Sequence, residues 1–235
     1  MTAPQETAPG AAAPPGAPPA AGPGPHLPPP RTARAGPGPG ARVVDLRGAT
    51  APGPLRLTAG DVLLVSGLPG SGKSTLIHRC VPAVDSRGRP VVRLDSQEVR
   101  LRFARGACGR LPYALYRPLV RLAHYRALAR ALRGAHSLVV HDCGAQPWVR
   151  RWVAAAAGRR RRRTHLLLLD VGAAEALAGQ RARGRTVSAY AFRRHRRAVH
   201  RLVGAAERGE APPGCARVLL LDRTAADVLP AVTFT

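Results

Sequence analysis

The chain has 235 residues, enough for one domain of ordinary size plus a tail, and its formal net charge is +24 at pH 7. No stretch approaches the roughly 18 apolar residues of a membrane span, and the four cysteines form no CxxC pair. The composition therefore argues against a helical membrane protein, a zinc site and a disulfide framework. We expect a cytoplasmic protein that is a monomer or a small homo-oligomer.

The first forty residues hold 13 of the 24 prolines and seven of the 25 glycines. Such a segment cannot bury enough apolar surface to offset the entropy lost on ordering, and it lacks the continuous apolar core of a signal peptide. We predict a disordered tail over residues 1–41 and one folded domain over residues 42–235.

After the tail, five apolar runs of strand length alternate with helical patterns, at residues 62–65, 91–94, 137–140, 165–169 and 218–221. This alternation is typical of βα units around a parallel sheet, and continuous apolar runs suit strands buried on both faces. A short edge strand near Val43 is a further possibility that the pattern does not decide. Helices are expected over residues 72–79, 118–133, 147–157, 173–183 and 188–203.

Two helix ends carry local signals. Ser188 is a plausible N-cap for the last of these helices. Gly158 is expected to adopt the left-handed conformation that ends the third, and the arginine run 159–163 to complement the negative end of that helix. The alternative is that the arginines form a polyanion-binding face.

The pattern GxxxxGK[ST] lies between the first strand and the first helix, where a phosphate-binding loop requires it. The glycines let successive backbone N–H groups point at phosphate oxygens, and the start of the helix adds its positive end. Lys73 is the only lysine in the chain, which makes a chance match improbable. The sequence predicts that ATP is bound by Gly67, Leu68, Pro69, Gly70, Ser71, Gly72, Lys73, Ser74 and Thr75.

Magnesium-assisted phosphoryl transfer needs further oxygen ligands and charge near the phosphates. We expect Lys73 to reach the β- and γ-phosphates, and Ser74 and Asp142 to serve the Mg²⁺ ion, since Asp142 follows a buried strand at the ligand edge of the sheet. The alternative role for Asp142 is a helix N-cap.

Asp95 ends the second predicted strand and can accept the proton of a substrate hydroxyl, while Arg100 can hold an anionic part of that substrate. Asp95 also reads as an N-cap with Glu98 at the third helical position, and the two readings are compatible. Arg181 and Arg185 lie in a glycine-flanked loop, where closure would bring positive charge to the phosphates.

Together these motifs resemble the small P-loop kinases grouped around polynucleotide kinase, zeta toxin and gluconate kinase, and the bacterial proteins labelled AAA family ATPase. The resemblance covers about residues 60–225. It implies a three-layer α/β fold with a five-stranded parallel sheet in the order 2-3-1-4-5, helices on both faces and a short lid. It also implies that Asp95 is the base, Arg100 the substrate clamp, Asp142 a Mg²⁺-shell residue, and Arg181 and Arg185 lid residues.

Two departures from the family pattern matter. Arg100 follows Asp95 by five residues, whereas the polynucleotide kinase-like spacing is about three, and Asp142 is followed by Cys143 rather than the glutamate of a hexameric motor. The leading hypothesis is an ATP-dependent kinase acting on a hydroxyl of a small molecule or a nucleic-acid end. The alternatives are an ATPase or nucleotide-dependent switch without an acceptor, and a basic nucleic-acid-binding protein regulated by ATP.

Overall fold

The structure is a computed structural model that describes residues 42–106, 111–142, 146–184 and 188–235. The predicted tail, residues 1–41, lies outside the described residues. Within the described ranges, no helix is both long enough and apolar enough to span a membrane.

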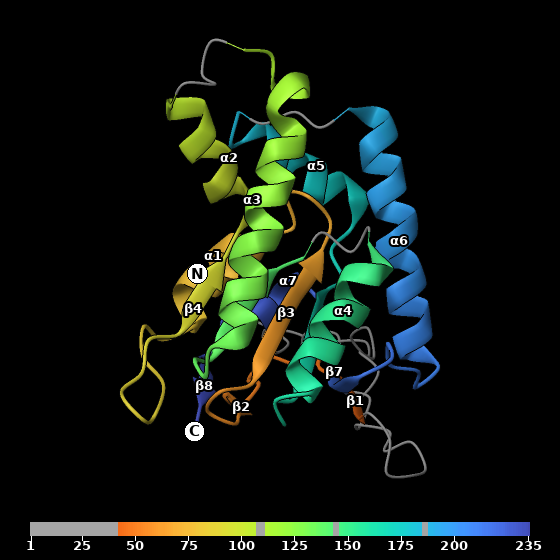
Figure 1. Cartoon of the computed structure of the whole chain (residues 1–235). Coiled ribbons are helices and arrows are strands. Elements are labelled where there is room, and N and C mark those ends of the chain that lie inside the picture. The colour runs from red at the N-terminus through yellow and green to blue at the C-terminus, as the bar shows by residue number, and fades with distance from the viewer. Residues whose placement is uncertain (1–41, 107–110, 143–145, 185–187) are drawn as a thin grey trace, which may run out of the picture.

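The centre of the fold is a parallel sheet with the strand order β1-β7-β6-β3-β5-β4, in which neighbouring strands are hydrogen-bonded (Figure 1). Its strands are β1 (Arg42–Asp45), β3 (Val62–Gly67), β4 (Val92–Leu94), β5 (Leu138–His141), β6 (Thr164–Leu169) and β7 (Cys215–Leu221). The order expected for the five predicted strands is confirmed as β4-β5-β3-β6-β7. The sheet has six strands rather than five, because an edge strand does form near Val43. This strand, β1, pairs with β7, with Val43 opposite Val218.

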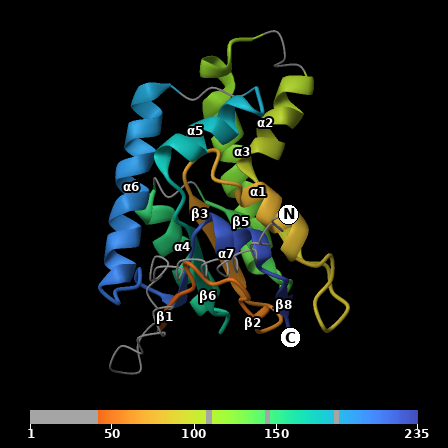
Figure 2. The same cartoon turned by 180° about the vertical axis from the view of Figure 1, so that it is seen from behind.

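Helices cover both faces of this sheet, which confirms the three-layer architecture. They are α1 (Lys73–Cys80), α2 (Ser96–Arg105), α3 (Tyr113–Arg133), α4 (Pro147–Gly158), α5 (Ala173–Arg181), α6 (Ala189–Glu207) and α7 (Arg223–Val228). One apolar core joins α3, α4 and α6 to the face of β3 that carries Leu64. The other joins α1 and α7 to the face that carries Leu63 and Val65, as the view from behind shows (Figure 2).

Several short elements were not predicted. β2 (Leu55–Leu57) and β8 (Val232–Phe234) form a separate two-stranded parallel sheet whose apolar residues join the core around α1 and α7. The helix α7 was also not predicted.

α3 begins five residues before the expected start, because Pro118 lies inside the helix rather than at its first position. α2 follows the capping signal at Asp95, whose side chain accepts a hydrogen bond from the Gln97 N–H at 2.8 Å.

The arginine run after α4 has a structural role that differs from the expected one. Gly158 is the last helical residue, and the left-handed residue is Arg161 with φ of 54°, so the prediction of a left-handed Gly158 is wrong. Arg162 donates hydrogen bonds to the carbonyls of Gly134 at 2.9 Å and His136 at 2.8 Å, beyond the end of α3. The guanidinium of Arg162 is thus engaged by backbone carbonyls within the chain.

Candidate functional site

The phosphate-binding loop has the backbone that its sequence requires. It follows β3, whose six residues are all buried, and leads directly into α1. Gly70 and Gly72 have φ values of 89° and 91°, in the left-handed region that glycine adopts without strain. Gly72 is the N-cap of α1 and has no side chain to satisfy the first N–H groups of the helix. This geometry suits an anion at the N-terminus of α1.

Lys73 lies under this loop and is 5% exposed. Its Nζ donates hydrogen bonds to the carbonyls of Gly67 at 2.9 Å and Leu68 at 2.7 Å. The ammonium group is therefore held beside the loop backbone at the carboxyl end of β3, within a short reach of any anion that the loop N–H groups bind.

The helix α5 packs directly against the outside of the loop. A Cβ at Gly70 would lie 2.0 Å from the carbonyl oxygen of Ala176, and a Cβ at Gly179 would lie 2.5 Å from the carbonyl oxygen of Gly70. The buried Gln180 donates to the Pro69 carbonyl at 3.0 Å. Both positions must therefore be glycine, because the two backbones touch there, and α5 fixes the position of the loop.

Arginine side chains lie near this loop after α5 and at the start of α7. Arg181 is exposed at the end of α5, and Arg185 lies outside the described residues. Arg183, between them, donates to the Thr75 hydroxyl at 2.9 Å. Arg223, at the start of α7, forms an ion pair with Glu175 at 2.6 Å, and its Nη1 would lie 2.6 Å from a Cβ at Gly72. Arg223 belongs to no motif that predicts this position.

The side chains of Asp95 and His141 contact each other between the carboxyl ends of β4 and β5. The Nδ1 atom of His141 lies 2.7 Å from Oδ2 of Asp95, and both side chains are largely buried. Burial raises the pKa of the Asp95 carboxyl, but the hydrogen bond and charge of His141, the Gln97 N–H and the charge of Lys73 outweigh it, so the net pKa lies below the ordinary value. With Nδ1 donating, a neutral His141 ring keeps its lone pair on Nε2. That atom is buried and has no hydrogen-bond partner among the described residues.

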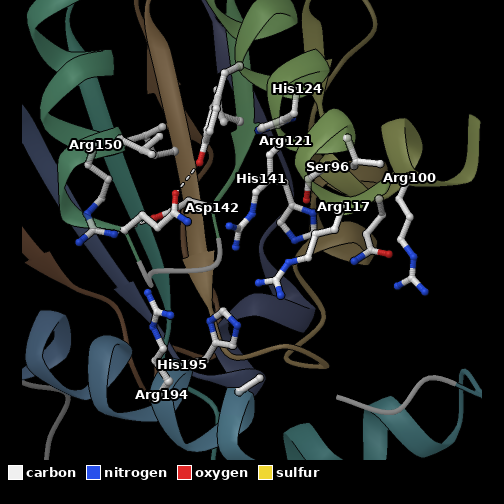
Figure 3. A pocket seen from close by; sticks show the side chains of 18 of the residues that line it. Ser96, Arg100, Arg117, Arg121, His124, His141, Asp142, Arg150, Arg194 and His195 are labelled. Carbon is white, nitrogen blue, oxygen red and sulfur yellow. Dashed lines mark hydrogen bonds and ion pairs between the residues drawn. The ribbon is translucent and has the colours of Figure 1, made fainter. Parts of the chain in front are cut away.

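His141 borders two hollows at this edge of the sheet. A small cleft is lined by Ser74 of the loop together with Asp95, Glu98 and His141. A cavity of about 450 Å³ lies on the other side, between α3 and α6, and His141 and Asp142 both line it (Figure 3). The histidine therefore stands between the phosphate-binding loop and the cavity.

Asp142 lies in the cavity wall and is ion-paired. Its Oδ2 accepts a hydrogen bond from Nη1 of Arg150 at 3.0 Å, with side chains 8% and 5% exposed. The N-cap of α4 is Gln146 rather than Asp142, and the oxygen Oδ1 of Asp142 has no donor within the described part of the chain. Arg100 lines the same cavity from α2. The structure thus brings Arg100 and Asp142 to one cavity and Ser74 and Asp95 to the neighbouring cleft.

The donors around the loop fit a magnesium ion, although the described residues contain no cluster of three or more carboxylate, histidine or thiol ligands. Mg²⁺ takes oxygen ligands and is usually held through one or two protein groups together with substrate phosphates and water. The Ser74 hydroxyl and the carboxylate oxygens at the ends of β4 and β5 are ligands of that kind.

Comparisons with known proteins agree with this fold. The model of one protein family, described as an AAA domain, matches residues 62–207. A chain of the PezAT chromosomal toxin–antitoxin system of Streptococcus pneumoniae is 15% identical, with a TM-score of 0.51 over 80% of this chain and 81% of that one. No curated protein matches the chain.

Two further solved structures are more distant in shape. A provisionally named kinase from Chloroflexus aurantiacus is 14% identical, with a TM-score of 0.45 over 71% of this chain and 87% of that one. The tunicamycin resistance protein of Deinococcus radiodurans is 15% identical, with a TM-score of 0.40 over 65% of this chain and 85% of that one. The family match and the PezAT structure confirm the expected resemblance to small kinase-like P-loop NTPases.

Proposed function

The chain belongs to the AAA domain family, and from that premise we propose that it is a Mg²⁺-dependent kinase that transfers the γ-phosphate of ATP to a hydroxyl group. The observation that carries this proposal is the position of His141. It borders the cleft at Ser74 on one side and the large cavity on the other. A hydroxyl of a molecule in the cavity would meet a proton acceptor on the side that faces the nucleotide loop.

The proton acceptor in this proposal is the Asp95–His141 pair. A carboxylate with a lowered pKa is a weak base, and one oxygen of Asp95 is already engaged by His141. The Nε2 atom of His141 has a lone pair and no partner among the described residues. Asp95 would orient the ring and stabilise its charged form, as the acidic member of a catalytic triad does. In this proposal Asp95 positions the ring instead of acting as the base expected from the sequence, and Nε2 removes the proton.

The transfer step balances without a further reactant. The acceptor oxygen forms a bond to the γ-phosphorus as its proton moves to Nε2 of His141, and the bond from the γ-phosphorus to the bridging oxygen breaks to leave ADP. Lys73 and the backbone N–H groups of residues 67–75, except that of Pro69, which has none, would bind the phosphates. Arg181 and Arg185 remain proposed lid residues, and the contact of Arg183 with Thr75 supports an arginine at this place.

Ser74 would hold the magnesium ion through its hydroxyl, and Asp142 is proposed for the ion's shell through its oxygen Oδ1. When bound, Mg²⁺ neutralises charge on the β- and γ-phosphates. The bond between Arg150 and the other oxygen of Asp142 fixes that carboxylate in the cavity wall.

The test is transfer of labelled γ-phosphate from ATP into pools of metabolites and oligonucleotides, with products identified by mass spectrometry. His141→Gln should lower transfer by about 100- to 10,000-fold while ATP affinity is unchanged, because only the proton acceptor is lost. His200→Gln, an exposed histidine on α6, is the matched control.

Two outcomes would contradict the proposal. Transfer by His141→Gln at the wild-type rate would show that the histidine is not the proton acceptor. Hydrolysis of ATP with no phosphorylated product in either pool, at a rate that Asp95→Asn does not alter, would favour an ATPase or switch.

A further inference from the structure

We infer that the cavity between α3 and α6 binds a phosphate group of a small hydroxylated acceptor, through Arg117, Arg121 and Arg194. That the ligand accepts a phosphoryl group rests on the proposed kinase function. The anion site itself is argued from the cavity alone. It narrows the substrate to a molecule that carries a phosphate before the reaction takes place.

The three arginines converge on the cavity from two helices. Arg117 and Arg121 are one helical turn apart on α3, and Arg194 lies on α6; all three line the cavity. Figure 3 shows the two α3 arginines reaching into the space that Arg194 and His195 face from the opposite side. Guanidinium groups that approach from different directions suit the several oxygens of a phosphate better than the two of a carboxylate.

No carboxylate of the described residues balances the charges of these three arginines. Among the described residues that line the cavity, Asp142 alone is a carboxylate, and it is paired with Arg150. In the parts of the chain that the structure describes, none of the three arginines makes an ion pair. Positive charges facing one hollow repel one another, and an anion placed among them removes that repulsion.

An arginine-rich composition alone would place some arginines on any surface. Several others, however, have partners within the chain: Arg47 pairs with Asp45, Arg208 with Glu210, and Arg162 with backbone carbonyls. Arg117, Arg121 and Arg194 differ because they share a concave site and make no ion pair with any residue that the structure describes. Their arrangement, rather than their number, points to a ligand.

Fixed charge at the site comes from arginine rather than histidine. Burial lowers the pKa of His124, with a smaller opposing effect from Asp95 and a further lowering from His141. The His124 ring, which also lines the cavity, is therefore neutral near pH 7. The guanidinium groups remain charged at any physiological pH, so their own contribution to anion binding does not change between about pH 6 and 8.

The size of the cavity favours a small molecule over a polymer. Its volume of about 450 Å³ lies in the range of ordinary ligand sites. A nucleic-acid strand would instead need a charged groove that continues past the cavity, and would be bound equally by exposed arginines farther along the same helices.

The experiment measures phosphate binding without catalysis. The full chain is saturated with Mg²⁺ and a non-hydrolysable ATP analogue, so that the phosphate-binding loop is occupied, and glucose 6-phosphate, gluconate or glucose is titrated by calorimetry. We expect glucose 6-phosphate to bind in the millimolar range, and gluconate and glucose more weakly. Arg117→Gln with Arg121→Gln should weaken that binding by about 10- to 100-fold, because two charge-assisted contacts are lost.

Arg126→Gln on α3 and Arg197→Gln on α6 are matched controls, since both arginines are exposed and neither lines the cavity. Equal binding by wild type and the double variant, or no detectable binding of glucose 6-phosphate, would overturn the inference. Tighter binding of gluconate would assign the site to a carboxylate and equally overturn it. The same result follows if a short oligonucleotide binds and the controls weaken it as much as the double variant.

The transfer screen separates this inference from the proposed function. An acceptor that gains phosphate but carried none beforehand would overturn the anion site and still support the kinase. Phosphate binding that depends on Arg117 and Arg121, in a protein that transfers no phosphate, would support the anion site and contradict the kinase.

Discussion

We predict that Gly179→Ala weakens ATP binding, although Gly179 lies on α5 and outside the phosphate-binding loop. The new Cβ would lie 2.5 Å from the carbonyl oxygen of Gly70, whereas ordinary contacts of this kind begin at 3.4 Å. The two backbones must therefore separate by about 0.9 Å, the difference between these distances. The loop should yield rather than α5, because Ala176 on that helix is completely buried.

Stability and binding should respond differently to this change. Alanine in place of a helical glycine favours the helix by about 0.5–1 kcal/mol, and overpacking opposes this by about 1–3 kcal/mol. The net loss of stability is therefore small. A displacement approaching 1 Å misaligns several loop N–H groups at once, and we expect ATP affinity to fall by about 10- to 100-fold.

Calorimetric titration with ATP and Mg²⁺, together with thermal denaturation, measures both quantities. The control is Gly158→Ala in the last residue of α4, where an added Cβ meets no atom within 4 Å. The control should bind ATP like wild type and be equally stable or slightly more so. Wild-type ATP affinity in a folded Gly179→Ala protein would refute the argument that α5 sets the position of the loop.

Three further predictions concern the nucleotide, acid stability and the tail. Lys73→Ala should abolish ATP binding measured by calorimetry, because it removes the only ammonium group at the loop; retained affinity would contradict the assignment of residues 67–75. Burial raises the pKa of Asp61, but its bonds to His165 and to backbone N–H groups lower it below the ordinary value of 3.8, so its contribution to stability is present above that pH and lost below it. In Asp61→Asn, the fall in the free energy of unfolding between about pH 5 and 3, followed by circular dichroism in urea, should be shallower than in wild type. Deletion of residues 1–41 should leave ATP affinity unchanged if residues 42–235 are the complete binding domain; a large loss would show that the tail forms part of the site.

The central sheet and the phosphate-binding loop were predictable because their signals are local. β3 is a continuous apolar run, and the loop motif follows it within the same short segment. The three-residue strands β2 and β8 are too short to show periodicity, and they pair across most of the chain, with Leu55 opposite Val232. α7, with six residues, is likewise too short for a helical pattern to be distinguished from a turn.

Predicting the Asp95–His141 pair from the sequence required one further fact, the register of the two strands. The family resemblance implied that the second and third predicted strands are neighbours, and each candidate follows or ends one of them. The register places Leu94 opposite Val140, so the next residues, Asp95 and His141, lie side by side. Without the register, His141 reads as the last residue of an apolar strand.

The arginines illustrate a limit of a different kind. In a chain with 36 of them, no single arginine stands out, and Arg100 and Arg181 were chosen by position relative to motifs. What separates Arg117 and Arg121 from Arg162 is the partner of each guanidinium, which depends on how α3, α4 and α6 pack on one face of the sheet. Composition reports how much positive charge a chain carries, whereas tertiary packing decides which of those charges its own backbone and carboxylates already satisfy. The cations left facing a cavity are therefore the ones for which we propose a ligand.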